Sequence, residues 1–209
     1  MKINKKTVIA LFMIVMFLFT ILISIGDVLE VLLRGNKRGT IEEVQETIVV
    51  IETTMGNIEV KLNAVSAPET TANFLDYVNS DFYVNTVFHR VIPGFMIQGG
   101  GFIASGKPKI TEDPIELESN NGLKNLRGTI AMARTSDPNS ATSQFFINLV
   151  DNEFLDYTST NEGYAVFGEV VEGMEVMEAI GNVKTATSGL FEDWPEEDVV
   201  ILGAHLKYN

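Results

Sequence analysis

Residues 88–100 read FHRVIPGFMIQGG, and the expected fold of the chain is built outward from this stretch. Its apolar runs are interrupted by Pro93-Gly94, and short apolar runs between turn residues are typical of β-strands. The Gly99-Gly100-Gly101 triplet that follows lacks the lysine and the spacing of a phosphate-binding loop. The glycines instead predict a bend or bulge where a strand of a barrel turns.

The alternation of apolar runs and turns continues in both directions. Upstream, Thr47–Thr53 and Ile58–Leu62 flank four turn residues, 54–57, and this pattern predicts a β-hairpin. Further strands are expected at Val87–Ile92, Phe95–Gln98, Thr129–Ala133, Gln144–Leu149, Ala165–Val170 and Val199–Lys207.

Two helices are expected among these strands. Ser66-Ala67-Pro68-Glu69 offers serine as the N-cap, proline in the first turn and glutamate at N3, so a helix should run from here to about Val78. A second helix fits Gly173–Ile180, closed by Gly181. Many short strands with two isolated helices favour a closed antiparallel sheet, because a barrel leaves no exposed edges. The pattern alone indicates a β-barrel or a sandwich with two helices.

The N-terminal part of the chain has a different character. Three lysines among the first six residues precede Thr7–Gly26, which contains no charge and as a helix would span ~30 Å, the thickness of a bilayer core. We expect residues 1–26 to be an uncleaved transmembrane signal anchor, 27–46 a juxtamembrane linker and 47–209 a domain on the extracytoplasmic side. Cleavage near Gly26, which would release a soluble exported protein, and a buried core helix are the alternatives.

Charge and composition exclude several classes of function. The chain carries −13 overall, while residues 1–39 carry +4 (six basic, two acidic), which leaves −17 on residues 40–209. Phosphate backbones would repel so acidic a domain, so nucleic acid is not an expected partner. The chain has no cysteine, and its two histidines, His89 and His205, are far apart, so no metal site is expected. A G-x-S-x-G nucleophile elbow is also absent from the sequence.

Several blocks of sequence together resemble the cyclophilins. Residues 88–100 resemble the signature of this family, and the other blocks follow in the expected order: Gly128–Arg134, Ser143–Asn148, Phe154–Asp156 and Tyr164–Gly168. The resemblance covers about residues 47–207. It implies an eight-stranded antiparallel closed barrel capped by two α-helices. It also implies peptidyl-prolyl cis-trans isomerase activity on proline-containing polypeptides, without a cofactor.

The chemistry of the X-Pro bond indicates what such a site must supply. Twisting the bond removes amide resonance and leaves a lone pair on the proline nitrogen, so a donor aimed at that nitrogen stabilises the twisted state selectively. Arg90 is the candidate donor, because its guanidinium remains charged and presents several fixed N–H groups. Gln98 is expected to hydrogen-bond Arg90 or the substrate carbonyl. The resemblance places both in the catalytic site and assigns substrate binding to Phe95, Met96, Ala133, Arg134, Gln144, Phe146, Phe154, Leu155 and Tyr164.

Two of these positions depart from the better-known eukaryotic pattern. Phe154 stands where those members have tryptophan, and Tyr164 where they have histidine, as in bacterial members of the family. Because an indole N–H donor is missing at residue 154, only weak cyclosporin binding is expected. Three roles remain open at this stage: an isomerase that assists folding of exported or membrane-proximal proteins, a non-enzymatic module that binds proline peptides, and a scaffold in a membrane complex.

Overall fold

A computed structural model describes residues 46–208 of the chain. The predicted transmembrane segment, residues 1–26, and nearly all of the predicted linker, 27–46, lie outside the described residues. Within residues 46–208, no helix has the length and apolar character needed to cross a membrane. The three predicted domain boundaries therefore stay predictions.

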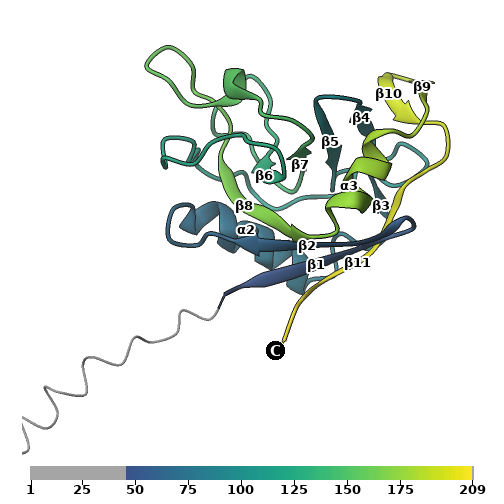
Figure 1. Ribbon diagram of the computed structural model, residues 1–209, viewed down its shortest axis with the longest axis horizontal. Helices are drawn as coiled ribbons and strands as arrows, with labels where there is room; N and C mark the ends of the chain where they lie inside the picture. The colour runs from purple at the N-terminus through teal and green to yellow at the C-terminus, as the bar shows by residue number, and fades with distance from the viewer. Residues whose placement is uncertain (1–45, 209) are drawn as a thin grey trace, which may run out of the picture. The chain divides into compact units, whose positions relative to one another are not determined.

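The described residues form eleven short strands, with two α-helices between them (Figure 1). The helices are α2 (Pro68–Asn79) and α3 (Met174–Gly181), and a short 3₁₀-helix, η2, covers Glu153–Leu155. The strands are β1 (Ile48–Thr53), β2 (Gly56–Leu62), β3 (Thr86–Val87), β4 (Arg90–Ile92), β5 (Met96–Gly99), β6 (Thr129–Met132), β7 (Phe145–Asn148), β8 (Val166–Glu172), β9 (Thr185–Ser188), β10 (Phe191–Pro195) and β11 (Val200–Leu206). The predicted hairpin is confirmed as β1 and β2, which pair antiparallel.

The main sheet is an antiparallel half-barrel, in the order β3-β11-β1-β2-β8-β6-β7-β5-β4. The prediction of eight strands is therefore wrong in its count, since the sheet has nine, whereas closure of the sheet into a barrel stays a prediction. The single strand expected at Val87–Ile92 is divided, because the chain changes partner at Phe88-His89. Before that point Val87 pairs with Val200 of β11, and after it Arg90 pairs with Gln98 of β5. The two edge strands are thus joined directly by the chain and not by a ladder of hydrogen bonds.

Helix α2 begins differently from the prediction. Its N-cap is Ala67, without a side-chain cap, so the predicted Ser66 cap is wrong. The carboxylate of Glu118 takes its place and accepts hydrogen bonds from the backbone N–H groups of Glu69 (3.1 Å) and Thr70 (2.7 Å). A carboxylate is well suited to this position, because the first N–H groups of a helix have no partner within the helix.

Helix α3 also differs from the prediction at its end. Gly181 lies inside the helix and the C-cap is Asn182, so the prediction that Gly181 closes the helix is wrong. Gly173 instead starts the helix in a left-handed conformation, with φ of +87°. A Cβ at Gly173 would lie 2.2 Å from the carbonyl oxygen of Asn57, so only glycine fits there without strain.

Alternating residues of the strands point to two different apolar clusters. Ile97, Ile130 and Ile147 are paired across β5, β7 and β6, and they belong to the larger cluster, which α2 and α3 cover with Phe74 and Met177 among others. Successive strand residues point to opposite faces of a sheet. Their neighbours therefore face the other side, where the smaller cluster is built from Met96, Ala131, Phe146, Leu155 and Val166.

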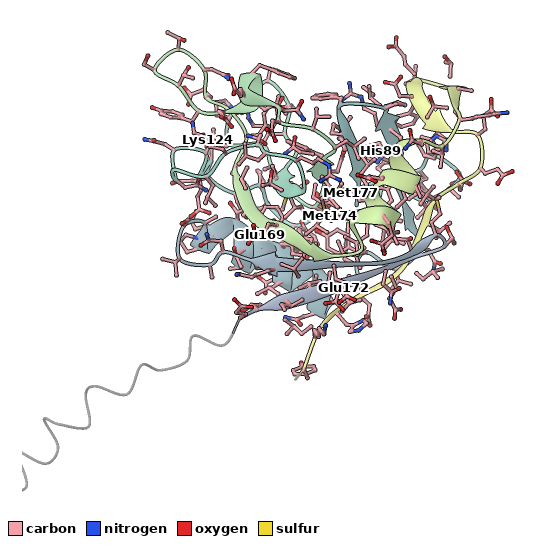
Figure 2. All side chains as sticks on the ribbon, viewed as in Figure 1. His89, Lys124, Glu169, Glu172, Met174 and Met177 are labelled. Carbon is pink, nitrogen blue, oxygen red and sulfur yellow. The ribbon has the colours of Figure 1, made fainter. Side chains whose placement is uncertain are left out.

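The sequence patterns missed the β9–β10 hairpin, which pairs as a separate two-stranded sheet. On β10, Phe191 packs against Phe102 and the ring of His89 at centroid distances of 4.9 and 6.1 Å, and Trp194 packs against His89 at 6.2 Å. Figure 2 labels His89 beside this hairpin. The hairpin thus covers the two-residue connection between β3 and β4.

Candidate active site

The polar side of the site is built on the paired strands β4 and β5. Arg90 and Gln98 are direct partners in this ladder, and the side chain of Arg90 is 46% exposed. The side-chain amide of Gln98 donates a hydrogen bond to Oε1 of Gln144 at 3.0 Å, so Gln98 is held by the residue directly before β7, and the structure records no bond between Gln98 and Arg90. The Nε of Arg90 instead lies 3.6 Å from Oδ2 of Asp193 on β10.

The predicted glycine bend is confirmed, and it makes room for Gln144. Gly100 has a φ of +81°, and a Cβ there would lie 2.8 Å from the ring of Tyr83. A Cβ on Gly101 would lie 2.5 Å from Cγ of Gln144. A larger residue at position 101 would therefore displace the side chain that positions Gln98.

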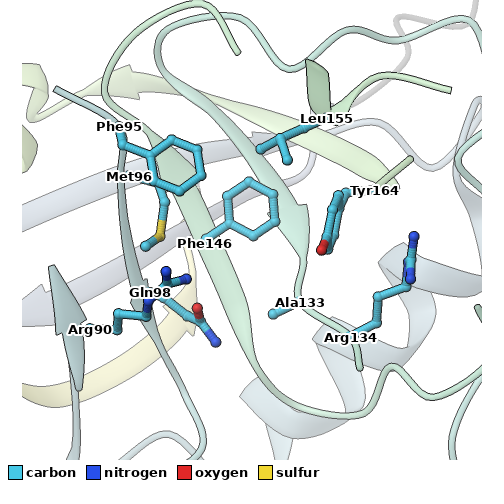
Figure 3. A pocket seen from close by; sticks show the side chains of 9 residues that line it. All are labelled: Arg90, Phe95, Met96, Gln98, Ala133, Arg134, Phe146, Leu155 and Tyr164. Carbon is cyan, nitrogen blue, oxygen red and sulfur yellow. The ribbon is translucent and has the colours of Figure 1, made fainter. Parts of the chain in front are cut away.

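The apolar side of the site belongs to the smaller cluster. Met96, Phe146 and Leu155 are 2%, 4% and 9% exposed, and together with Phe95 they line the apolar side of a pocket of about 110 Å³. Figure 3 shows these four side chains together, with Arg90 and Gln98 at one end of the pocket. A ring-sized apolar group can thus bind beside a guanidinium.

Arg134 and Tyr164 close the opposite end of the pocket (Figure 3). The guanidinium of Arg134 lies over the Tyr164 ring, 4.6 Å from its centroid, and donates to the carbonyl of Gly163 through Nε and Nη2 at 3.1 and 2.8 Å. Tyr164 also contacts Phe146 edge to face at 5.5 Å. Arg134 is therefore occupied in holding the wall that carries Tyr164.

The structure brings most of the predicted site residues together. Nine of the eleven line one pocket: Arg90, Phe95, Met96, Gln98, Ala133, Arg134, Phe146, Leu155 and Tyr164. Gln144 lies behind Gln98, and Phe154 stacks on Phe95 at 5.6 Å while remaining 66% exposed on the rim. Asp193 was missed, because no local pattern links it to Arg90, about a hundred residues away in the chain.

His89 lies directly before Arg90 but is buried, 3% exposed, in the aromatic cluster under β10. Burial lowers the pKa of His89 to about 4, and the neighbouring charge of Arg90 acts in the same direction. Its Nδ1 has no hydrogen-bond partner. Within residues 46–208, no three acidic or histidine side chains are grouped so as to hold a metal ion.

Comparison with known proteins agrees with this geometry. Residues 48–206 match the family model of the cyclophilin type peptidyl-prolyl cis-trans isomerases. The chain is 54% identical over 160 residues to peptidyl-prolyl cis-trans isomerase A of Dickeya dadantii, covering 77% of this chain and 84% of that one. It is 55% identical over 157 residues to isomerase B of Escherichia coli K12, covering 74% of this chain and 96% of that protein.

A solved structure is similar as well. The crystal structure of a cyclophilin type isomerase from Cryptosporidium parvum, determined in the presence of the dipeptide Ala-Pro, matches with a TM-score of 0.68 at 30% identity. The match covers 78% of this chain and 99% of that one. The chain belongs to the cyclophilin family of peptidyl-prolyl cis-trans isomerases. It is accordingly an isomerase that accelerates rotation about X-Pro peptide bonds.

Proposed function

We propose that Arg90 is the catalytic donor and that the neighbouring apolar pocket binds the proline ring of the substrate. An X-Pro bond rotates over a barrier of ~18–20 kcal/mol, which corresponds to tens of seconds or longer without a catalyst. Reaching milliseconds requires a gain of about 10⁴–10⁵, or ~6–7 kcal/mol. No covalent step is needed, because a donor to the nitrogen of the twisted bond stabilises that state more than either planar state.

The single observation that supports this assignment is the position of Arg90 beside the pocket, on a strand paired with the strand that carries Met96 and Gln98. With proline held against Met96, Phe146 and Leu155, its nitrogen would face the polar end of the pocket. Gln98, oriented by Gln144, then hydrogen-bonds the carbonyl that swings during rotation. The presence of Ala-Pro with the similar Cryptosporidium parvum cyclophilin supports an X-Pro ligand for this pocket as well.

The test is Arg90→Ala, with Arg127→Ala as the matched control. Arg127 is 45% exposed and paired with the carboxylate of Glu178, so it resembles Arg90 in exposure and pairing, but it lies outside the pocket. Loss of the donor should lower kcat/KM about 100-fold, or ~2.7 kcal/mol, in a proline-peptide isomerisation assay. Both variants should keep the circular dichroism of the wild type. An Arg90→Ala activity within twofold of wild type would refute the donor role.

We further propose that residues 1–26 hold the enzyme at the outer face of a cytoplasmic membrane, where it assists the folding of exported or membrane-proximal proteins. The support is the uncharged run Thr7–Gly26 behind three lysines, followed by an acidic domain with few positive charges to oppose export. Chains that emerge unfolded carry mixed X-Pro isomers, which re-equilibrate slowly enough to limit folding. Tethering would raise the effective concentration of the isomerase near these chains.

Protease treatment of intact spheroplasts, followed by blotting, tests the orientation, and mass spectrometry of the mature N-terminus tests the tether. The domain should be digested from outside and the N-terminus should remain intact. A protected domain would contradict the orientation. A new N-terminus at Asp27 would mean that the segment is a cleaved signal peptide and that the exported enzyme is soluble.

A further inference from the structure

Three asparagines are buried behind the pocket. Asn125, Asn148 and Asn152 are only 1%, 0% and 2% exposed. A buried side-chain amide costs free energy unless its hydrogen-bonding groups find partners, so three such residues together require a physical explanation. None of them lines the pocket.

Their side chains form one continuous chain of hydrogen bonds. Nδ2 of Asn152 donates to the carbonyl of Phe95 at 3.0 Å and to Oδ1 of Asn148 at 2.8 Å. Nδ2 of Asn148 donates to Oδ1 of Asn125 at 3.3 Å. Nδ2 of Asn125 donates to the carbonyl of Leu155 at 3.1 Å. The chain therefore begins and ends on the backbones of two pocket residues.

The remaining donors are also used. The Asn125 amide reaches Oδ1 of Asp156 at 3.2 Å, and the Asn148 amide reaches Oγ1 of Thr129 at 3.0 Å. Nζ of Lys124, labelled in Figure 2, lies 3.5 Å from Oδ2 of Asp156 at the outer end of the network. Because each amide uses its Nδ2 in at least two bonds, each side chain has one satisfied orientation, and the network is expected to be stiff.

The two pocket residues at the ends of this network are weakly held by regular structure. Phe95 precedes β5, and Leu155 ends the three-residue helix η2. Each carbonyl has one backbone partner, since Phe95 accepts from the N–H of Leu149 and Leu155 accepts from the N–H of Tyr164, both at 2.9 Å. The amide network supplies the second bond to each carbonyl and is the link between them.

We propose that Asn125, Asn148 and Asn152 are positioning residues that fix the separation of the Phe95 and Leu155 walls of the pocket. This inference rests on the proposed function, in which those walls bind proline. An apolar pocket binds a rigid five-membered ring well only if its walls stay at contact distance, so loosening either wall weakens ground-state and transition-state binding together. The network thus sets substrate affinity, whereas Arg90 sets the rate of rotation.

The test is Asn152→Ala, measured with a proline tetrapeptide by NMR titration for Kd and by exchange for the rate of rotation on the enzyme. Kd should rise about five- to tenfold, while the rate of rotation at saturation changes less than about twofold. Asn152→Ser is the second variant, because its hydroxyl retains one donor and it is the milder change if Asn152→Ala does not fold; its Kd should lie between those of wild type and Asn152→Ala.

Thr70→Ala is the matched control. It removes a partly buried hydrogen bond, from Thr70 Oγ1 to Glu118 Oε2 at 2.7 Å, in a helix that contributes nothing to the pocket. It should lower Tm without changing Kd. The inference is overturned if the folded Asn152 variants keep the wild-type Kd, or if Thr70→Ala raises Kd as much as they do. Arg90→Ala in the same assays separates the two proposals, because full activity there would refute the donor role whatever Kd the Asn152 variants show.

Discussion

The two apolar clusters share the same strands but have different surroundings. The larger cluster faces α2 and α3, and its members at the strand pairs of β5, β6 and β7 are fully buried. The smaller cluster, on the opposite face, is covered only by loops and η2 and opens into the pocket. Because side chains alternate along β5, Ile97 faces the larger cluster and stabilises the fold, whereas its neighbours Met96 and Gln98 face the site. Substitutions on the two faces should consequently have different effects.

The largest expected effect is on the helix-covered face. Phe74 is fully buried on α2, with the rings of Tyr83, Phe145 and Phe167 at 5.2–5.7 Å. Phe74→Ala should lower the free energy of unfolding by ~3–5 kcal/mol, because it leaves a cavity among aromatic rings. Urea unfolding measures this loss. Activity per folded molecule should stay near that of wild type.

Phe146→Ala is the counterpart on the pocket face. Phe146 is 4% exposed but borders open space in the pocket, so the lost contacts fall partly on the substrate. We expect a smaller loss of stability than for Phe74→Ala and a clear fall in kcat/KM. Equal activity in the two variants would break the comparison between the faces.

The aromatic cluster under β10, which contains His89, adds a pH dependence of stability to this comparison. The pKa of His89 is about 4 in the folded protein against an ordinary 6.5, so the unfolded chain binds the proton more tightly. The contribution of neutral, buried His89 to the free energy of unfolding is therefore complete above pH 6.5 and is lost as the pH falls toward 4. It should amount to about 2 kcal/mol between pH 7 and pH 5, at ~1.4 kcal/mol per pKa unit.

In His89→Phe, the free energy of unfolding should change much less between pH 7 and pH 5 than in the wild type. Urea unfolding at several pH values measures this. His205→Phe, at an exposed position of β11, is the control. An unchanged slope in His89→Phe would show that the decline arises elsewhere.

The smallest expected effect concerns the rim of the pocket. Phe154 is stacked on Phe95 and exposed, and it offers no donor to a ligand. We predict weak cyclosporin inhibition of the wild type and about tenfold tighter inhibition of Phe154→Trp, or ~1.4 kcal/mol, since the indole adds an N–H donor. Inhibition constants for both proteins and for Phe154→Leu, which adds no donor, decide the point. Tight inhibition of the wild type would contradict the prediction.

Local sequence was sufficient for much of the fold and of the site. Strands β5, β6, β7 and β11 lie within one or two residues of their predicted bounds, because apolar runs between turns mark them directly. The pocket residues followed from motif blocks whose order the fold preserves. Pattern could not show that Phe88-His89 separates two strands, since the change of partner depends on β11, far along the chain.

The other misses have the same origin in distant contacts. The start of α2 is capped by Glu118, from a loop about fifty residues further on, and not by the nearby Ser66. Asp193 reaches Arg90 only because the β9–β10 hairpin packs on Phe102 and His89. Short-range rules describe propensity and periodicity. They do not predict which distant segment will supply the partner of a hydrogen-bonding or charged group.

The pairing of β1 with β11 has a consequence for the order of events during synthesis. Val49 pairs with Leu206, about 150 residues further along the chain. At a synthesis rate of ~5–20 residues per second, β11 is made on the order of ten seconds or more after β1. During that interval one side of β1 presents unpaired backbone groups, which is a known risk for aggregation. A long-range closing contact also tends to slow folding. The first strand of this isomerase therefore lacks one of its two partners until β11, the last strand in chain order, has been synthesised.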